Sequence, residues 1–183
     1  MSRFFDTFKL NITIPLNFNK KDRKKVLEIS KFMDKIYSLL YSSKENNNHY
    51  IIRRSLGYFV RSYQTEYYAD SVLFLCIAFE MLLGEKISEN IEAHIVNIIL
   101  FLKKGNENDK KEFKNLYSSR SGVAHEGDPR KCDIQYCRYL YFEIFYKIVK
   151  LEQKGVDLSK KSYLSEYINN VFTSKLKFIP DIK

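Results

Sequence analysis

The chain has 183 residues, of which 45% are hydrophobic and 29% charged, and its 31 Lys and Arg against 22 Asp and Glu give a net charge of +9. This length predicts one compact core and is too short for two ordinary domains. The composition excludes a collagen-like, linker-like or wholly disordered chain. With only six Gly and three Pro there are few tight turns, which favours long helices over a sandwich of many strands. We therefore expect an all-α domain.

Residues 8–18 alternate strictly between apolar and polar or small side chains, which is the period of a strand. The other β-like stretch is 176–182 at the far end of the chain. The sequence therefore predicts an extended segment at 1–21 and a possible short β ribbon in which the two termini pair beside the helices. Pro15 would mark an edge or the end of that pairing.

Seven helices are predicted after this segment. Apolar residues recur at three- and four-residue steps from Asp22 to about Ser43, which indicates the first of them. The others are expected at about 49–63, 66–83, 87–104, 110–119 and 134–151, and at 163–171 after a start at Asp157 or Ser159. The pattern predicts an up-and-down fold of about six to seven helices, with the bundle itself at 22–155. A C-terminal helix and tail at 156–183 are expected to pack on it.

The three cysteines, Cys76, Cys132 and Cys137, form no CxxC pair and are too few for a disulfide framework, which predicts a reducing cytoplasm and no metal site. The first residues carry Asp6 before any apolar run, unlike a signal peptide. The most apolar stretch, 72–79, is far shorter than the roughly 18 residues that span a bilayer, so it is predicted to be a buried core helix. We expect no cofactor and no membrane association.

Familiar enzymatic motifs are absent from the sequence: it has no glycine-rich phosphate loop, no HExxH, no nucleophile elbow and no EF-hand loop. Of the three histidines only His125 has a candidate partner, Arg120. Five residues of regular helix put these two side chains about 140° apart. Their convergence on one site therefore requires the fifth helix to end between them, and Gly122 permits such an end.

An arginine and a histidine that converge in this way suit a phosphodiester. A guanidinium holds a phosphate with forked hydrogen bonds, and an imidazole titrates close enough to neutrality to give or take a proton. Such a pair also arises by chance in many sequences, so a purely structural role as local helix caps is a second interpretation of Arg120 and His125.

The string Tyr117-Ser118-Ser119-Arg120-Ser121-Gly122-Val123-Ala124-His125-Glu126-Gly127 resembles the RxxxxH motif of the HEPN superfamily, particularly its Apea-like branch. Glu126 is an insertion relative to that pattern. Residues 78–84, Ala-Phe-Glu-Met-Leu-Leu-Gly, are similar to the helix that precedes the motif in that family, and the order of elements matches the HEPN bundle over roughly residues 24–152. The resemblance implies a metal-independent endoribonuclease, commonly a homodimer in which two Arg/His pairs meet across a two-fold axis.

The resemblance also implies roles for single residues. An RNA 2′-hydroxyl would attack the neighbouring phosphorus, with His125 handling a proton and Arg120 stabilising charge in the transition state. Ser121 is a candidate to orient the phosphate or the arginine. Glu80 either holds Arg120 in a buried ion pair or lies as a carboxylate on the bundle surface. Tyr117 either stacks on a base or packs in the core.

The basic excess lies in the first and last thirds of the chain. It includes a cluster that is either a weak RNA-binding segment or a solvated lysine-rich surface, formed by Lys20, Lys21, Arg23, Lys24 and Lys25. The main functional hypothesis is a toxin or antiviral-defence ribonuclease controlled by a separately encoded antitoxin or sensor. The alternative is a non-catalytic module that binds RNA or a protein partner.

Overall fold

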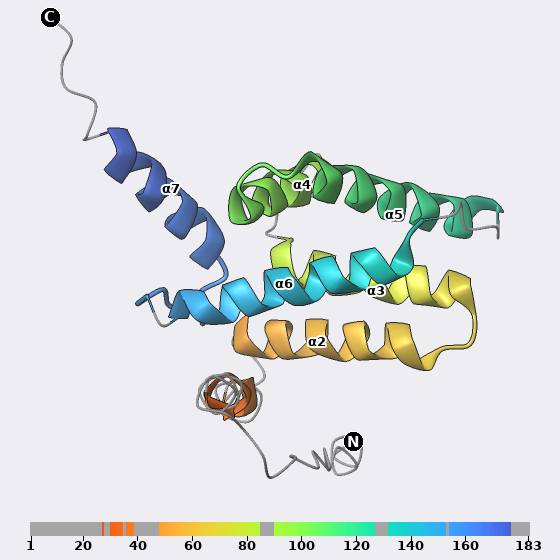
Figure 1. Cartoon of the computed structure of the whole chain (residues 1–183), viewed down its shortest axis with the longest axis horizontal. Helices are drawn as coiled ribbons and strands as arrows, with labels where there is room; N and C mark the ends of the chain where they lie inside the picture. The colour runs from red at the N-terminus through yellow and green to blue at the C-terminus, as the bar shows by residue number, and fades with distance from the viewer. Residues whose placement is uncertain are drawn as a thin grey trace, which may run out of the picture. The chain divides into compact units, whose positions relative to one another are not determined.

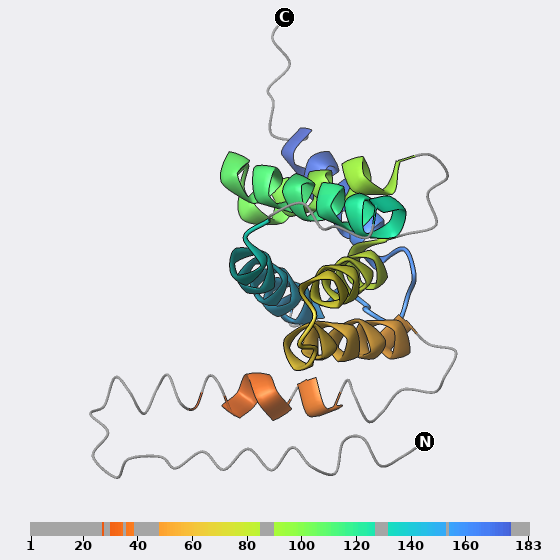
Figure 2. The ribbon, with the colours of Figure 1, turned by 90° about the vertical axis from the view of Figure 1, so that its right-hand side faces the viewer.

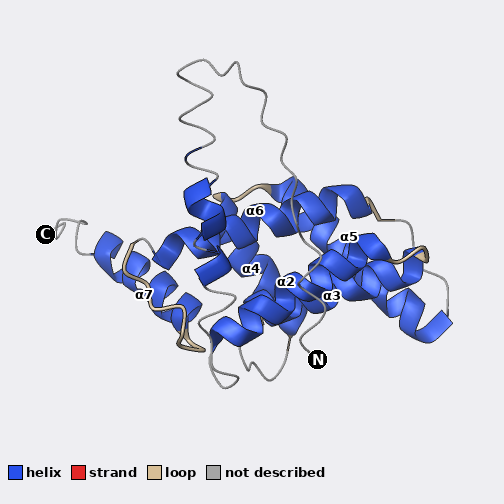
Figure 3. Ribbon diagram, turned by 90° about the horizontal axis from the view of Figure 1, so that it is seen from below, coloured by secondary structure: helices blue, strands red, loops and turns tan. Residues whose placement is uncertain are grey.

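The computed structural model describes residues 27, 30–34, 36–38, 48–84, 90–126, 132–152 and 154–176. All regular elements within these residues are helices, which confirms the predicted all-α fold (Figure 3). The segment 1–21, with its predicted strand, lies outside the described residues. So do residues 177–182 of the expected partner strand, whereas Leu176 ends a helix.

The chain divides into two compact units, Met1–Tyr37 and Ser38–Lys183. Residues 30–34 and 36–37 of the first unit are helical, as predicted. The labelled helices of the second unit are α2 (Asn48–Gln64), α3 (Tyr68–Leu83), α4 (Ile91–Lys103), α5 (Glu107–Glu126), α6 (Ile134–Glu152) and α7 (Tyr163–Leu176) (Figure 1).

Helix α3 is the centre of the second unit. It packs against α2, α4, α5 and α6, and an end-on view shows α3 and α6 between α2 on one side and α4 with α5 on the other (Figure 2). Val72, Leu75, Cys76 and Phe79 of α3 are completely buried, as expected of a helix that is apolar all round. Each such large apolar side chain stabilises the fold by about 1.5–3 kcal/mol.

A buried hydroxyl pair joins three of these helices. The Tyr141 hydroxyl of α6 lies 2.6 Å from Ser55 Oγ of α2, and Ser55 Oγ donates to the Ala78 carbonyl of α3 at 2.7 Å. The tyrosine hydroxyl is therefore the donor to the serine oxygen. The Tyr141 ring also stacks on Phe59 of α2, with centroids 4.5 Å apart. Complete burial raises the pKa of Tyr141, so its hydroxyl stays protonated in this core.

The predicted end of the fifth helix near Ser119 is wrong, because α5 continues through Gly122 to Glu126. Ser119 and Gly122 are buried, as are Phe113 and Leu116 earlier in the helix, both of them completely. A glycine inside a helix costs only about 1 kcal/mol relative to alanine. The burial of these residues outweighs that cost, so the helix continues past Gly122.

Helix α7 and the segment before it contact the rest of the second unit through specific groups. The Tyr163 hydroxyl donates to the Leu82 carbonyl at 3.2 Å, and the Tyr167 ring meets Phe101 of α4 edge to face. Asn48 at the start of α2 donates from Nδ2 to the Leu158 carbonyl at 2.8 Å. Among the described residues, none of the helices has the length and apolar character needed to cross a membrane.

Candidate functional site

Three of the predicted site residues meet at the packing of α3 on α5. Arg120 Nη1 lies 2.9 Å from Oε1 of Glu80 and donates to the Tyr117 hydroxyl at 3.2 Å. The Tyr117 hydroxyl in turn donates to the same Oε1 of Glu80. The ion pair expected between Glu80 and Arg120 is therefore present, and the tyrosine completes a closed triangle of polar contacts.

The local sequence explains why these groups meet. Tyr117 and Arg120 are three residues apart on α5 and so lie on one side of that helix. Glu80 lies in the last turn of α3, which ends at Gly84. The Gly84 N–H donates to the Glu80 carbonyl at 2.7 Å, and a Cβ at Gly84 would collide with that oxygen. Only glycine accommodates this close turn.

The triangle orients Arg120 without burying it. The Arg120 side chain is 38% exposed and that of Glu80 is 20% exposed, so the predicted buried pair is only partly buried. The guanidinium carbon lies over the Tyr117 ring, 5.2 Å from its centroid. Within the described residues the polar contacts of this guanidinium use Nη1, which leaves Nε and Nη2 as donors for an anion.

Tyr117 and Cys76 remain neutral beside this arginine. Burial, together with the hydrogen bond to Glu80, raises the pKa of Tyr117 far above its ordinary range. Burial likewise raises the pKa of Cys76, although Arg120 opposes the shift. Neither group supplies a general base at neutral pH, so the triangle offers a positioned positive charge and needs a separate group to move a proton.

The other predicted site residues do not join this triangle within the described structure. Ser121 is exposed on the next position of α5. His125 belongs to the last turn of α5, and its side chain lies outside the described residues. Also outside them lies the basic cluster of Lys20, Lys21, Arg23, Lys24 and Lys25. Because α5 is continuous, positions 120 and 125 are about 140° apart around the helix axis.

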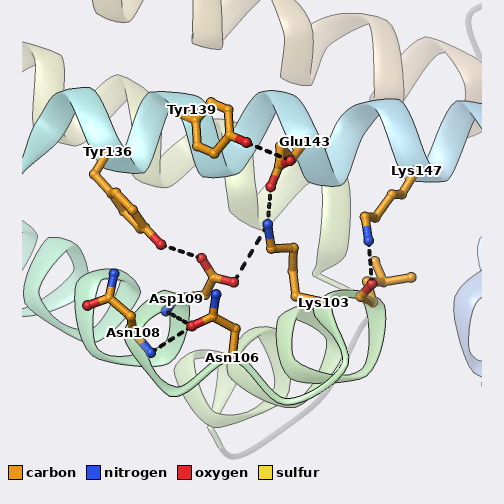
Figure 4. Close-up of polar contacts among 9 residues, drawn as sticks. Lys103, Asn106, Asn108, Asp109, Tyr136, Tyr139, Glu143 and Lys147 are labelled. Atoms are coloured by element: carbon orange, nitrogen blue, oxygen red, sulfur yellow. Dashed lines mark hydrogen bonds and ion pairs between the residues drawn. The ribbon is translucent and has the colours of Figure 1, made fainter.

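A second polar network, which the sequence patterns did not reveal, lies at the corner between α4 and α5 (Figure 4). Lys103 at the end of α4 contacts Glu143 of α6 directly and lies 3.7 Å from Oδ2 of Asp109 in α5. The hydroxyls of Tyr136 and Tyr139 donate to Asp109 and Glu143, each at 2.7 Å. Asp109 is 1% exposed, so this network contains a carboxylate taken almost entirely out of water.

The network joins three helices rather than forming a reaction site. Burial raises the pKa of Glu143, but the hydrogen bonds from Lys103 and Tyr139 outweigh it, and the pKa lies below its ordinary value of 4.5. Burial lowers the pKa of Lys103, but the carboxylates of Glu143 and Asp109 raise it by more, so the pKa lies above its ordinary value of 10.5. Lys103 and Glu143 are therefore both charged at neutral pH, and each is the ion-pair partner of the other. We therefore assign the network to stability.

A cavity of about 320 Å³ lies between α4 and α7. Its walls are formed by His94, Asn97, Ile98, Phe101, Ser165, Ile168 and Asn169. None of the residues predicted for the functional site lines it. The described part of the chain brings together no group of three or more His, Cys, Asp or Glu side chains that could hold a metal ion.

Comparison of the chain with protein-family models, with curated proteins and with solved structures gives no match. The function is therefore inferred from the residues of this chain.

Proposed function

We propose that this protein is a metal-independent endoribonuclease of the HEPN type. The observation that carries the proposal is the partly exposed guanidinium of Arg120, which Glu80 and Tyr117 hold from one side. An arginine with free N–H donors in a fixed orientation is suited to phosphate recognition. His125 follows it by five residues in the same helix and adds the group that titrates near neutrality.

The proposed reaction is a transesterification within the RNA strand. The 2′-hydroxyl attacks the adjacent phosphorus, so an O2′–P bond forms while the P–O5′ bond breaks. His125 accepts the proton from the 2′-hydroxyl and returns a proton to the leaving O5′, so that its own protonation state is restored. Arg120 stabilises the additional negative charge on the phosphorane-like transition state. The products are a 2′,3′-cyclic phosphate and a 5′-hydroxyl, and the balance requires no water.

The proposal includes a homodimer. Since Arg120 and His125 diverge around a continuous α5, a second protomer related by a two-fold axis would complete the site without new sequence. Tyr139 and Phe142 of α6 are large aromatic side chains exposed on the bundle, and a partner copy is one way to cover them. Light scattering of the full chain measures this association directly.

We further propose that the enzyme acts in the cytoplasm as a toxin or antiviral-defence effector. A ribonuclease with so compact a site needs external control, which a separately encoded antitoxin or sensor protein would provide. The net charge of +9 favours an RNA substrate, because positive charge strengthens binding to phosphates.

The test is cleavage of total RNA by the purified full chain in EDTA, with analysis of the product ends. We expect cyclic phosphate and 5′-hydroxyl ends, and no cleavage of a substrate with 2′-deoxyribose at the scissile position. Arg120→Ala and His125→Ala should each reduce the rate about 100-fold or more, since positioned proton transfer alone contributes about 10²–10⁴.

Lys114→Ala is a matched control for Arg120→Ala, because Lys114 is an exposed cation of the same helix. It should cleave at the wild-type rate. Unchanged cleavage by His125→Ala would overturn the mechanism. Intact RNA with wild type, alone and after addition of candidate activators, would instead favour the non-catalytic RNA- or protein-binding module.

A further inference from the structure

Helix α2 carries an arginine-rich surface for which the candidate site has no use. Arg53 and Arg54 lie over the Tyr50 ring, 5.0 and 5.7 Å from its centroid, and Arg61 lies over Tyr58 at 5.3 Å. We call these five residues the α2 arginine stripe. No Asp or Glu occurs between Glu45 and Glu66 in the sequence, so the helix carries three arginines and no carboxylate.

The stripe is on the side of α2 that faces away from the core. Seven residues of helix place Arg54 and Arg61 within about 20° of one another and about 10 Å apart along the axis. Phe59, which is buried against the core, lies about 160° from Arg61. Both arginines are exposed, and within the described residues neither lies within 4 Å of a carboxylate.

The surface between the two arginines is open. Apart from its chain neighbours and the backbone of its own helix, no atom of the described structure lies within 4 Å of the position that a Cβ would take at Gly57, which lies between them on this side. A guanidinium that stacks on an aromatic ring still presents its N–H donors at the edge, and the stacking restricts its motion. The stripe therefore offers two oriented forks for anions, each beside a half-buried tyrosine ring.

We propose that the α2 arginine stripe binds the backbone of single-stranded RNA. Arginine forks that follow one helix side suit a chain of phosphates, and tyrosine rings next to them suit unpaired bases. Paired strands would not offer their bases to these rings. This inference rests on the proposed function and extends it, since it identifies the substrate class as unpaired RNA and places a binding surface outside the Arg120 cluster.

The test uses a fluorescent 2′-O-methyl oligouridylate about 12 nucleotides long, within the usual range of single-strand sites. This probe lacks the 2′-hydroxyl, so binding is measured independently of cleavage. We expect Arg54→Ala/Arg61→Ala to weaken binding about tenfold or more. The dependence of log affinity on log salt should become shallower by about 1.4, since each phosphate contact to a single strand contributes about 0.7.

Lys154→Ala/Lys161→Ala removes the same charge from exposed positions elsewhere and should change affinity by less than twofold. Arg54→Lys/Arg61→Lys keeps the charge but loses the fork and should fall between the alanine variant and wild type. All three are surface changes, so their thermal unfolding should match that of wild type.

The inference would be overturned if Arg54→Ala/Arg61→Ala bound the probe as tightly as the wild-type protein does. It would also be overturned if the wild-type protein did not bind the probe. Equal binding of polyglutamate would assign the stripe to acidic proteins instead. His125→Ala should retain the affinity. If binding of the probe depends on the stripe but the wild-type protein leaves unmodified RNA intact, the proposed catalysis is refuted and this inference is supported.

Discussion

Glu80 Oε1 accepts from both Arg120 Nη1, at 2.9 Å, and the Tyr117 hydroxyl, so one carboxylate oxygen orients two side chains of the neighbouring helix. Arg120 is thereby held in one direction although more than a third of its side chain is exposed. A long side chain at such exposure would otherwise sample many rotamers. In the proposed ribonuclease, this orientation is prepared before the substrate binds.

Replacing Glu80 by Gln should therefore affect cleavage more than stability. We expect kcat to fall about tenfold, equivalent to about 1.4 kcal/mol of transition-state stabilisation, because Arg120 loses its charged partner. The free energy of unfolding should fall by only about 1 kcal/mol or less, since the pair is partly exposed. Cleavage kinetics and urea unfolding of the same preparations measure both quantities.

The matched control for that substitution is Glu107→Gln, which breaks the exposed pair between Glu107 and Lys110 on the same helix. Glu107→Gln should leave both kcat and the free energy of unfolding unchanged. Equal losses of kcat in the two variants would show that orientation of Arg120 does not contribute to the reaction.

Glu143→Gln should destabilise the fold only in a defined pH window. The pKa of Glu143 is depressed below 4.5, so its contribution is present above that pH and is lost as the pH falls through the folded-state value. The pKa of Lys103 is raised above 10.5, so its contribution persists until the pH exceeds that value. We expect a loss of about 1 kcal/mol at pH 7 and none well below pH 4.5.

Urea unfolding of wild type and Glu143→Gln at both pH values measures this difference. Glu166→Gln breaks the exposed pair with Lys160, in which both side chains are more than half exposed, and should change neither value. A deficit in Glu143→Gln that is independent of pH would contradict the assignment of the contribution to the charged pair.

Arg138 is a second cation with a structural task. It is 7% exposed and, within the described residues, no carboxylate lies within 4 Å of it. Its guanidinium donates to the Ser62 carbonyl near the end of α2 and to Ser71 Oγ at 3.3 Å, and it lies over the Tyr63 ring at 4.1 Å. A positive charge at a helix C-terminus complements the helix dipole there.

Arg138→Met should therefore lower the free energy of unfolding by about 2 kcal/mol, because the Ser62 carbonyl loses a charged donor in a buried site. Urea unfolding of wild type and Arg138→Met measures this difference in the free energy of unfolding. Arg138→Lys should recover only part of the loss, since an ammonium group lacks the planar fork. A methionine variant as stable as wild type would show that apolar packing alone suffices at this position.

Cys132 should be the reactive thiol of the folded protein. A hydrogen bond with Cys137 and others from Tyr68 and Ser119 lower the pKa of Cys132 to about 6, against the opposing effect of burial. Cys76 and Cys137 are buried, and their pKa values are raised. Mass spectrometry after brief iodoacetamide treatment at pH 7 should find Cys132 alkylated, at a rate that declines below about pH 6.

Tyr68→Phe removes one of the hydrogen bonds to that thiol and should move the midpoint of alkylation to higher pH. Alkylation of Cys132 with a midpoint near the ordinary value of 9.0 in wild type would contradict the depressed pKa.

Local patterns were sufficient for much of the fold. The apolar spacing of α2, α3 and α6 predicted their positions to within a few residues, because each helix buries a regular side and ends where polar or glycine residues follow. The same reasoning failed at Gly122, where the burial of one side of α5 outweighs a residue that locally favours an end. The burial depends on which helices pack against α5, and the sequence pattern of α5 alone does not contain that information.

Glu80 and Tyr117 were candidates through a family resemblance and Arg120 also through its spacing to His125, and the structure brings Glu80, Tyr117 and Arg120 together. The Lys103 network and the α2 arginine stripe had no such signal beyond an arginine-rich stretch without carboxylates. Whether a charged side chain pairs, stacks or faces water depends on which helices pack against its own. The sequence therefore determined the helices and the candidate chemistry, whereas tertiary packing alone decided that Arg120 is held by Glu80, that Arg138 is buried, and that Arg54 and Arg61 face outward.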